Sequence, residues 1–140
     1  SVQYAPCCRP VPGDPIVGYL GRGEGLVVHI ADCPVASRLR HKDAERFIHV
    51  EWADEPARPF ETGVIVTVTN GKGVLARVAS AFAGAEADII HMDMGEEAAQ
   101  EATDLRFLIA VRDSTHLDGV LRALNRTTSV LRANRTRPAS

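Results

Sequence analysis

The chain has 140 residues, of which 45% are hydrophobic and 24% are charged, and its formal net charge is −2. These proportions are typical of a folded globular protein, and the near-neutral balance gives no sign of bulk attraction to nucleic acid. No run of about 18 apolar residues occurs, so we expect no membrane span. Three cysteines are an odd number, which argues against a closed disulfide framework and favours a reducing, cytoplasmic setting.

Composition divides the chain into two blocks, residues 1–53 and 62–140, joined by a linker at residues 54–61. The stretch that begins at Ala53 reads ADEPARPFE, in which prolines and acids occur without hydrophobic periodicity. Blocks of this size bury little apolar surface, so we expect a metal, a partner or dimerisation to reinforce them. Ser1 lies inside what reads as structured sequence, and we expect the chain to be a fragment of a longer protein.

The first block reads as a small β-rich unit with one helix. Residues 16–20 are predicted as an apolar strand, residues 21–25 (GRGEG) as a turn and residues 26–30 as the returning strand. Asp32 or Cys33 is expected to cap a short helix with Pro34 in its first turn, and residues 47–52 alternate as a third strand. Because GRGEG precedes a strand and not a helix, it is not a dinucleotide-binding loop.

The second block has the order β-α-β-β-α-β, which is typical of a ferredoxin-like domain. Strands are predicted at residues 64–69, 87–94, 103–111 and 129–135. One helix follows from apolar residues at helical spacing in 74–84, and a second is expected to begin with Ser114 as its cap. The predicted fold class is therefore α+β, a β-rich Cys/His domain followed by a ferredoxin-like domain.

Cysteine and histidine residues in the first block form a candidate metal site. His29 and Cys33 are four residues apart, a spacing typical of half of a zinc site, and Cys7 and Cys8 are candidates for the other half. Adjacent residues on a strand point to opposite sides, so both thiols can ligate only if the backbone turns there. The alternative is a set of buried, inert thiols beside a core histidine. A nucleophilic cysteine is disfavoured because no orienting acid or oxyanion donor accompanies it.

A glycine-containing loop leads directly into the first helix of the second block. Backbone N–H groups at such a helix start suit an anion as small as an amino-acid carboxylate, and glycines allow it to approach closely. A plain turn with a helix cap is the alternative interpretation. The candidate ligand-binding residues are Asn70, Gly71, Lys72, Gly73, Val74 and Leu75.

The residues of the first block closely resemble a known family. The run YAPCCRPVPGDPIVGYLGRGEGLVVHIADCP, residues 4–34, carries a CC-x-P-x-PGD element and an H-x3-C element. It resembles the conserved-cysteine, zinc-finger or ribosome-intersubunit domain of long RelA/SpoT-homologue enzymes. Residues 62–135 look like the ACT domain that follows it in those enzymes, so the resemblance covers nearly the whole chain.

The resemblance implies the roles of several residues. Cys7, Cys8, His29 and Cys33 match the positions that bind zinc in this family. The domain that carries them is implied to contact ribosomal RNA near the A-site tRNA. Charge alone selects the candidates for phosphate contact, and a solvated helix face is the alternative interpretation. These candidates are Arg9, Arg22, Arg38, Arg40 and Lys42.

Two functions follow from the resemblance. The first is a non-catalytic regulatory module of a guanosine tetraphosphate, (p)ppGpp, enzyme in the bacterial stringent response. It would dock to the ribosome and tRNA, act on its own N-terminal catalytic domains and form homodimers through the ACT domain. The alternative is an allosteric sensor of branched-chain amino acids. The catalytic domains that would distinguish a bifunctional from a synthetase-only parent lie outside this chain.

Overall fold

The computed structural model describes residues 1–56, 58–95 and 101–136, and these residues form two compact units. The first unit spans residues 1–58 and the second spans residues 59–136. Residue 57 of the predicted linker (residues 54–61) lies outside the described part of the chain. So do residues 96–100 and 137–140 of the predicted second block.

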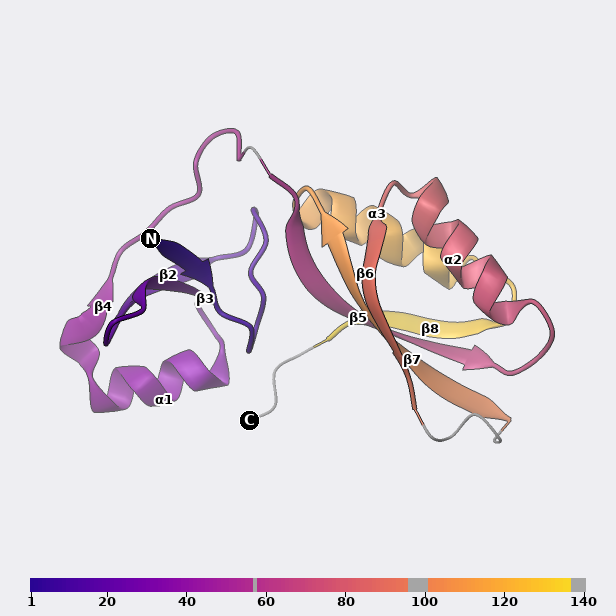
Figure 1. The fold of residues 1–140 in the computed structure, drawn as a ribbon, viewed down its shortest axis with the longest axis horizontal. Coiled ribbons are helices and arrows are strands. Elements are labelled where there is room, and N and C mark those ends of the chain that lie inside the picture. The colour runs from indigo at the N-terminus through magenta and orange to yellow at the C-terminus, as the bar shows by residue number, and fades with distance from the viewer. Residues whose placement is uncertain (57, 96–100, 137–140) are drawn as a thin grey trace. The chain divides into compact units, whose positions relative to one another are not determined.

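The first unit is a four-stranded sheet with one α-helix, shown in indigo to magenta in Figure 1. Its strands have the order β1-β3-β2-β4, in which β1 runs parallel to β3 and the other neighbours are antiparallel. A short 3₁₀ helix, Ala44–Arg46, follows the α-helix. The remaining elements are β1 (Val2–Tyr4), β2 (Ile16–Gly21), β3 (Gly25–Ile30), α1 (Pro34–Lys42) and β4 (Phe47–Ile48).

Two features of the first unit differ from the sequence prediction. The strand predicted at residues 47–52 is shortened to Phe47–Ile48. Beyond it, the Trp52 indole N–H donates to the carbonyl oxygen of Asp14 at 2.9 Å, and its ring stacks on Tyr4 with centroids 5.7 Å apart. These contacts hold Trp52 against Tyr4 and Asp14, while pairing with β2 ends at Ile48. Strand β1 was not predicted because its three residues are too few to show an alternating pattern.

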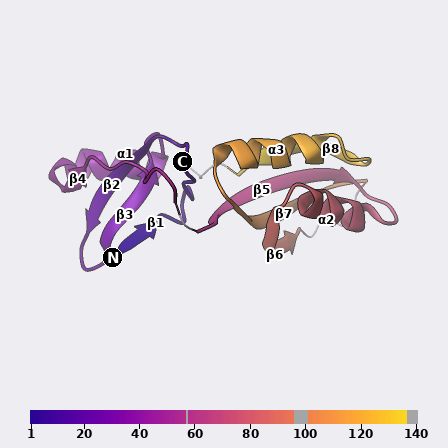
Figure 2. The same ribbon diagram turned by 90° about the horizontal axis from the view of Figure 1, so that it is seen from above.

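The second unit is a four-stranded antiparallel sheet with the strand order β6-β7-β5-β8. Figures 1 and 2 show its two helices side by side on one face of the sheet. This βαββαβ order confirms the predicted α+β class. Its elements are β5 (Phe60–Thr69), α2 (Val74–Gly84), β6 (Asp88–Met94), β7 (Ala102–Val111), α3 (Ser114–Asn125) and β8 (Val130–Arg135).

Alternating side chains of β5 and β7 form the core beneath the helices. Val64 and Ile109 are fully buried, as expected for apolar residues on the covered face of a sheet. Phe82 of α2 packs against Phe107 of β7 with ring centroids 4.8 Å apart. The register of β5 with β7 starts at the pair Phe60–Val111, so the strand begins four residues before its predicted start and includes the end of the predicted linker.

The N-cap of helix α3 lies one residue before the predicted one. Asp113, not Ser114, is the N-cap, and its carboxylate accepts a hydrogen bond from the backbone N–H of His116 at 2.8 Å. A carboxylate at this position satisfies one open N–H group and interacts favourably with the positive end of the helix dipole. No helix among the described residues has the length and apolar character needed to cross a membrane.

Candidate metal centre

A turn after β1 places both adjacent cysteines at the same site. The backbone N–H of Ala5 still pairs with Val28 of β3 at 2.9 Å, and the chain then turns. The N–H of Arg9 donates to the Ala5 carbonyl at 2.8 Å, and Arg9 itself has a positive φ of 47°. The turn on which ligation by both cysteines depended is therefore present, because the extended backbone ends before Cys7.

The end of β3 and the start of α1 supply the other two side chains. His29 is the penultimate residue of β3, and Cys33 is the N-cap of α1. Between them, the N–H of Cys33 donates to the Ile30 carbonyl at 3.0 Å, which forms a tight turn. Pro34 then occupies the first turn of the helix, where a missing N–H costs nothing. The H-x3-C spacing thus joins a strand end to a helix start.

These four side chains converge. The ligand atoms of Cys7, Cys8, His29 and Cys33 all lie within 4.8 Å of one another. Cys7 Sγ is 3.6 Å from Cys33 Sγ, 3.9 Å from Cys8 Sγ and 3.4 Å from His29 Nδ1. Cys8 Sγ is 4.0 Å from the same ring nitrogen and accepts a hydrogen bond from the Ile30 N–H at 3.3 Å.

Three of these four distances fit a tetrahedral metal ion, and the Cys8–His29 distance of 4.0 Å is longer than the ideal value. With Zn–S of about 2.3 Å and Zn–N of about 2.0 Å, sulfur ligands lie about 3.8 Å apart and sulfur and nitrogen about 3.5 Å apart. The Cys7–Cys33 and Cys7–Cys8 separations of 3.6 and 3.9 Å bracket the first value, and the Cys7–His29 distance of 3.4 Å is close to the second. Three thiols and an imidazole form a ligand set that suits zinc and leaves no open coordination position.

Burial controls the protonation of these groups when no metal is bound. Burial, reinforced by the neighbouring Cys33 thiol, raises the pKa of Cys7 above its ordinary value. Burial likewise raises the pKa of Cys8 strongly and lowers the pKa of His29. Each shift favours the neutral form, because a charge is poorly solvated inside the protein. Metal binding must therefore release protons from the thiols.

One side of the cluster opens into a pocket of about 350 Å³. Cys7 and His29 line it together with apolar side chains, and the charged residues Arg22 and Glu24 contribute to its wall. The three thiols differ in exposure: Cys7 is half-buried, whereas Cys8 and Cys33 are only 6% and 1% exposed. Solvent therefore reaches this cluster mainly through Cys7.

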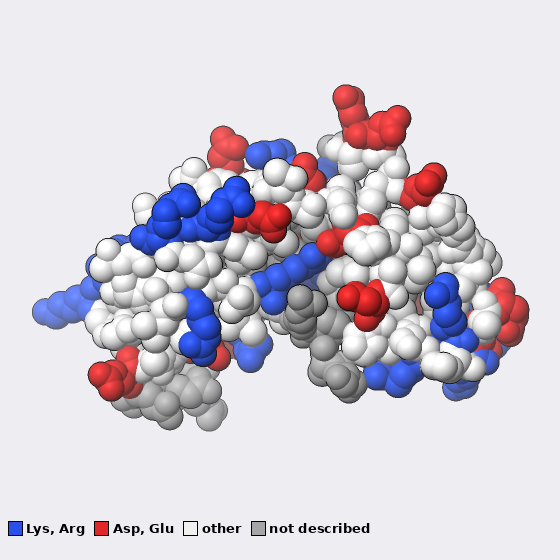
Figure 3. All heavy atoms as spheres, turned by 180° about the vertical axis from the view of Figure 1, so that it is seen from behind, with Lys and Arg blue, Asp and Glu red and all other residues white. Residues whose placement is uncertain are grey.

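The basic residues selected by charge differ in their surroundings. Arg38 and Lys42 are exposed and four residues apart on α1, so they lie on the same face of the helix. Arg40 extends over the ring of Phe47, 4.8 Å from its centroid, and Arg22 lies 3.9 Å from the Asp43 carboxylate. On the face drawn in Figure 3, acidic and uncharged side chains interrupt the Lys and Arg side chains.

The glycine-containing loop of the second unit lies where the sequence predicted, at the start of α2. Gly73 is its N-cap with a left-handed φ of 76°, and no side-chain hydrogen bond caps the helix. The loop is held by backbone bonds from Asn70 N–H to the Glu101 carbonyl and from Thr69 N–H to the Ser129 carbonyl. In the first turn of α2, Val74 is buried in the core and Leu75 is exposed.

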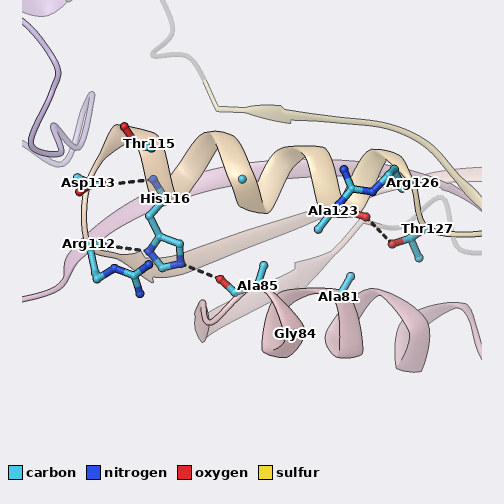
Figure 4. Close-up of a pocket in the computed structure, with 11 residues that line it drawn as sticks. Ala81, Gly84, Ala85, Arg112, Asp113, Thr115, His116, Ala123, Arg126 and Thr127 are labelled. Carbon is cyan, nitrogen blue, oxygen red and sulfur yellow. Dashed lines mark hydrogen bonds between the residues drawn. The ribbon is translucent and has the colours of Figure 1, made fainter.

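A second pocket was not predicted. It measures about 650 Å³ and lies between α2 and α3 (Figure 4). His116, which is 9% exposed, accepts from the Arg112 N–H at Nδ1 and donates from Nε2 to the Ala85 carbonyl. It thereby ties the start of α3 to the end of α2. A lone histidine in the sequence gave no signal of these partners.

Comparison with known proteins shows which domain families the two units belong to. Residues 1–53 match the RelA/SpoT RIS domain and residues 56–135 match the ACT domain, which makes the chain a RIS unit followed by an ACT domain. The chain is 33% identical over 136 residues to the bifunctional (p)ppGpp synthase/hydrolase SpoT of Escherichia coli, covering 97% of this chain and 19% of that protein.

Two GTP pyrophosphokinases are also similar. The Streptomyces coelicolor enzyme is 33% identical, covering 88% of this chain and 14% of the enzyme. The Escherichia coli enzyme is 28% identical, covering 95% of this chain and 18% of the enzyme. The chain therefore spans less than a fifth of the length of these relatives. It belongs to the RelA/SpoT family and corresponds to the C-terminal regulatory region, which confirms the resemblance inferred from residues 4–34.

Proposed function

We propose that this chain is a non-catalytic regulatory module of a (p)ppGpp enzyme of the stringent response, and that its first unit docks to ribosomal RNA. The observation that carries the proposal is the four-residue Cys/His cluster with tetrahedral spacing. Zinc held by four protein ligands has a structural role, since no position remains for substrate or water. The module would act on the N-terminal catalytic domains of the full-length enzyme.

The cluster supports RNA docking because it sets the position of a basic helix. Cys33 is both a cluster residue and the N-cap of α1, and α1 carries the exposed pair Arg38 and Lys42. A metal that holds Cys33 therefore also holds the start of this helix. Guanidinium and ammonium groups on a fixed surface favour phosphate contact, although the net charge of the chain is slightly negative.

Ribosome co-sedimentation at increasing salt concentration tests this proposal. In the full-length enzyme, the double variant Arg38→Gln/Lys42→Gln removes two phosphate contacts, so binding should weaken and the salt slope should fall by about 2. The matched control is Arg122→Gln/Arg126→Gln, which removes the same charge at the same spacing from exposed positions at the end of α3. Equal losses in both variants, or no binding by the wild type, would contradict docking through α1.

Self-association would use the outer edge of β6. This strand is at the end of the sheet, and within the described residues it pairs only with β7. It also exposes the apolar side chains of Ile89, Ile90 and Met94. Long apolar edge strands favour pairing with another chain. Sedimentation velocity should show a dimer for the wild type and a monomer for Ile90→Lys, and a dimer unaffected by this change would exclude the β6 edge.

An amino-acid sensor is the second candidate function, and the start of α2 supports it. The left-handed Gly73 and the uncapped first turn leave backbone N–H groups for a carboxylate. Isothermal titration with valine, isoleucine and leucine tests binding, with alanine as the non-branched control. Gly71→Leu suits this test because a Cβ at Gly71 makes only an ordinary contact with Val74 at 3.8 Å. If the wild type gives no binding heat, or if Gly71→Leu gives the same heat as the wild type, this loop is excluded as the site.

A further inference from the structure

We infer that Cys7 and Cys33 form a peroxide-sensitive pair, and that oxidation to a Cys7–Cys33 disulfide releases the metal from the cluster. The inference rests on the proposed metal centre and assigns unequal roles to its three thiols. Cys7 is the site of attack by the oxidant, Cys33 is the resolving thiol and Cys8 remains reduced. The result is a modification site that controls metal occupancy of the first unit.

The distances select the pair. Cys7 Sγ and Cys33 Sγ are 3.6 Å apart, closer than the 3.9 Å between Cys7 Sγ and Cys8 Sγ. A disulfide between adjacent residues is also unfavourable, because their Cα atoms are only about 3.8 Å apart and disulfides usually need at least about 4.4 Å. Cys8 is further restrained by the hydrogen bond that its sulfur accepts from the Ile30 N–H at 3.3 Å.

Exposure selects the thiol that reacts first. Cys7 is half-buried and lines the pocket of about 350 Å³, so a molecule as small as a peroxide can reach its sulfur. Cys8 and Cys33 are buried, and neither lines this pocket. Oxidation of cysteine follows thiolate character and accessibility, and an accessible thiol beside a second thiol is the arrangement that yields a disulfide.

The chemistry needs hydrogen peroxide as its only co-reactant. The Cys7 sulfur, a thiolate in the metal-bound protein, attacks one peroxide oxygen and breaks the O–O bond, which gives a sulfenic acid and hydroxide. The Cys33 thiolate then attacks the Cys7 sulfur and expels a second hydroxide as the S–S bond forms. Two protons from solvent convert the hydroxides to water. The two sulfurs together lose two electrons, and the peroxide gains two.

Disulfide formation has a defined structural consequence. The two sulfurs must move from 3.6 Å to about 2.05 Å apart, and neither remains available as a thiolate ligand. Cys8 and His29 alone are too few for a tetrahedral structural site. The new bond still joins the turn after β1 to the N-cap of α1, so the unit loses its metal and gains a covalent link in its place.

The test uses the wild-type protein, reconstituted with zinc and exposed to hydrogen peroxide. A chromogenic chelator measures zinc release, and tandem mass spectrometry after alkylation and trypsin digestion locates the disulfide. We expect one zinc released per Cys7–Cys33 link, an alkylated Cys8, and full reversal by dithiothreitol with added zinc. A link through Cys8, a link between two chains, or zinc release without a disulfide would overturn the inference.

Two further results separate this inference from the metal proposal. A purified protein that binds no zinc would refute the metal centre, and peptide mapping would still decide whether Cys7 pairs with Cys33. Leu39→Phe, which narrows the pocket without altering a ligand, should slow oxidation severalfold and leave zinc stoichiometry unchanged. The control is Leu20→Phe, an exposed position outside the pocket lining. Equal oxidation rates in the two variants would contradict access through the pocket.

Discussion

The two units of this chain are stabilised by different means. The first unit buries mainly small side chains and thiols, namely Ala5, Cys8, Cys33 and Ala36, together with Val11 and Val28. The second unit buries large apolar side chains such as Phe82, Ile109 and Leu124 in a continuous layer between sheet and helices. Apolar burial scales with the area removed from water, so the second unit gains far more from it. We therefore expect the stability of the first unit to depend on a bound metal and that of the second unit not to.

Metal removal should have the largest effect and should separate the two units. Structural zinc contributes apparent binding energies of about 10–16 kcal/mol in small zinc domains, so chelation should unfold the first unit. The only tryptophan, Trp52, belongs to this unit, and its fluorescence reports the loss directly. Amide NMR signals from β5 to β8 should remain. Their simultaneous loss would show that the units fold as one, and unchanged fluorescence would show that the metal is dispensable.

Phe82→Ala is the corresponding test of the second unit. Removal of a fully buried aromatic ring costs about 3–5 kcal/mol, because apolar contacts are lost and a cavity remains. We expect urea denaturation, followed by far-UV circular dichroism, to show a destabilised second unit. Zinc stoichiometry and Trp52 fluorescence should match those of the wild type. A loss of zinc in this variant would contradict the independence of the two units.

Asp113→Ala should have a smaller effect in the same unit. It removes the side chain that accepts the His116 N–H at 2.8 Å, and loss of such a cap costs about 1 kcal/mol. Asp113→Asn serves as the control, since asparagine is an equally good cap. Urea midpoints should fall for alanine and change little for asparagine. Equal losses would point to the charge of Asp113 as the important property.

In the metal-free first unit, where acid cannot displace a metal, acidification should have the smallest effect. Burial lowers the pKa of His29 in the folded state, so below about pH 6.5 the unfolded state binds more protons than the folded state. Stability therefore falls as the pH decreases through this range. The measurement follows Trp52 fluorescence as the pH of the chelated protein is lowered, with a stabilising osmolyte present to keep the metal-free unit folded. The fluorescence should report the loss of stability in the wild type and not in His29→Gln. A pH response retained in His29→Gln would assign the effect to another group.

Much of this architecture followed from local pattern. Apolar periodicity predicted both helices of the second unit and the positions of its strands, because residues 74–84 and 103–111 each bury one face at a regular spacing. The strand boundaries were less accurate. The start of β5 was missed because Glu61, Thr62 and Gly63 carry no β-branched run, and only pairing with β7 extends the strand to Phe60.

Sequence alone identified the residues that could bind a metal, because His29 and Cys33 have ligand spacing and Cys7 and Cys8 can complete the set. It could not determine whether Cys7 and Cys8 point to one place. That depended on a turn held by the Ala5 carbonyl and on the pairing of Ala5 with Val28. Tertiary structure likewise decided that Cys7 is accessible and Cys33 is buried. Exposure depends on what packs around a side chain, and the neighbours of Cys7 come from β2, β3 and α1, which are distant from it in sequence.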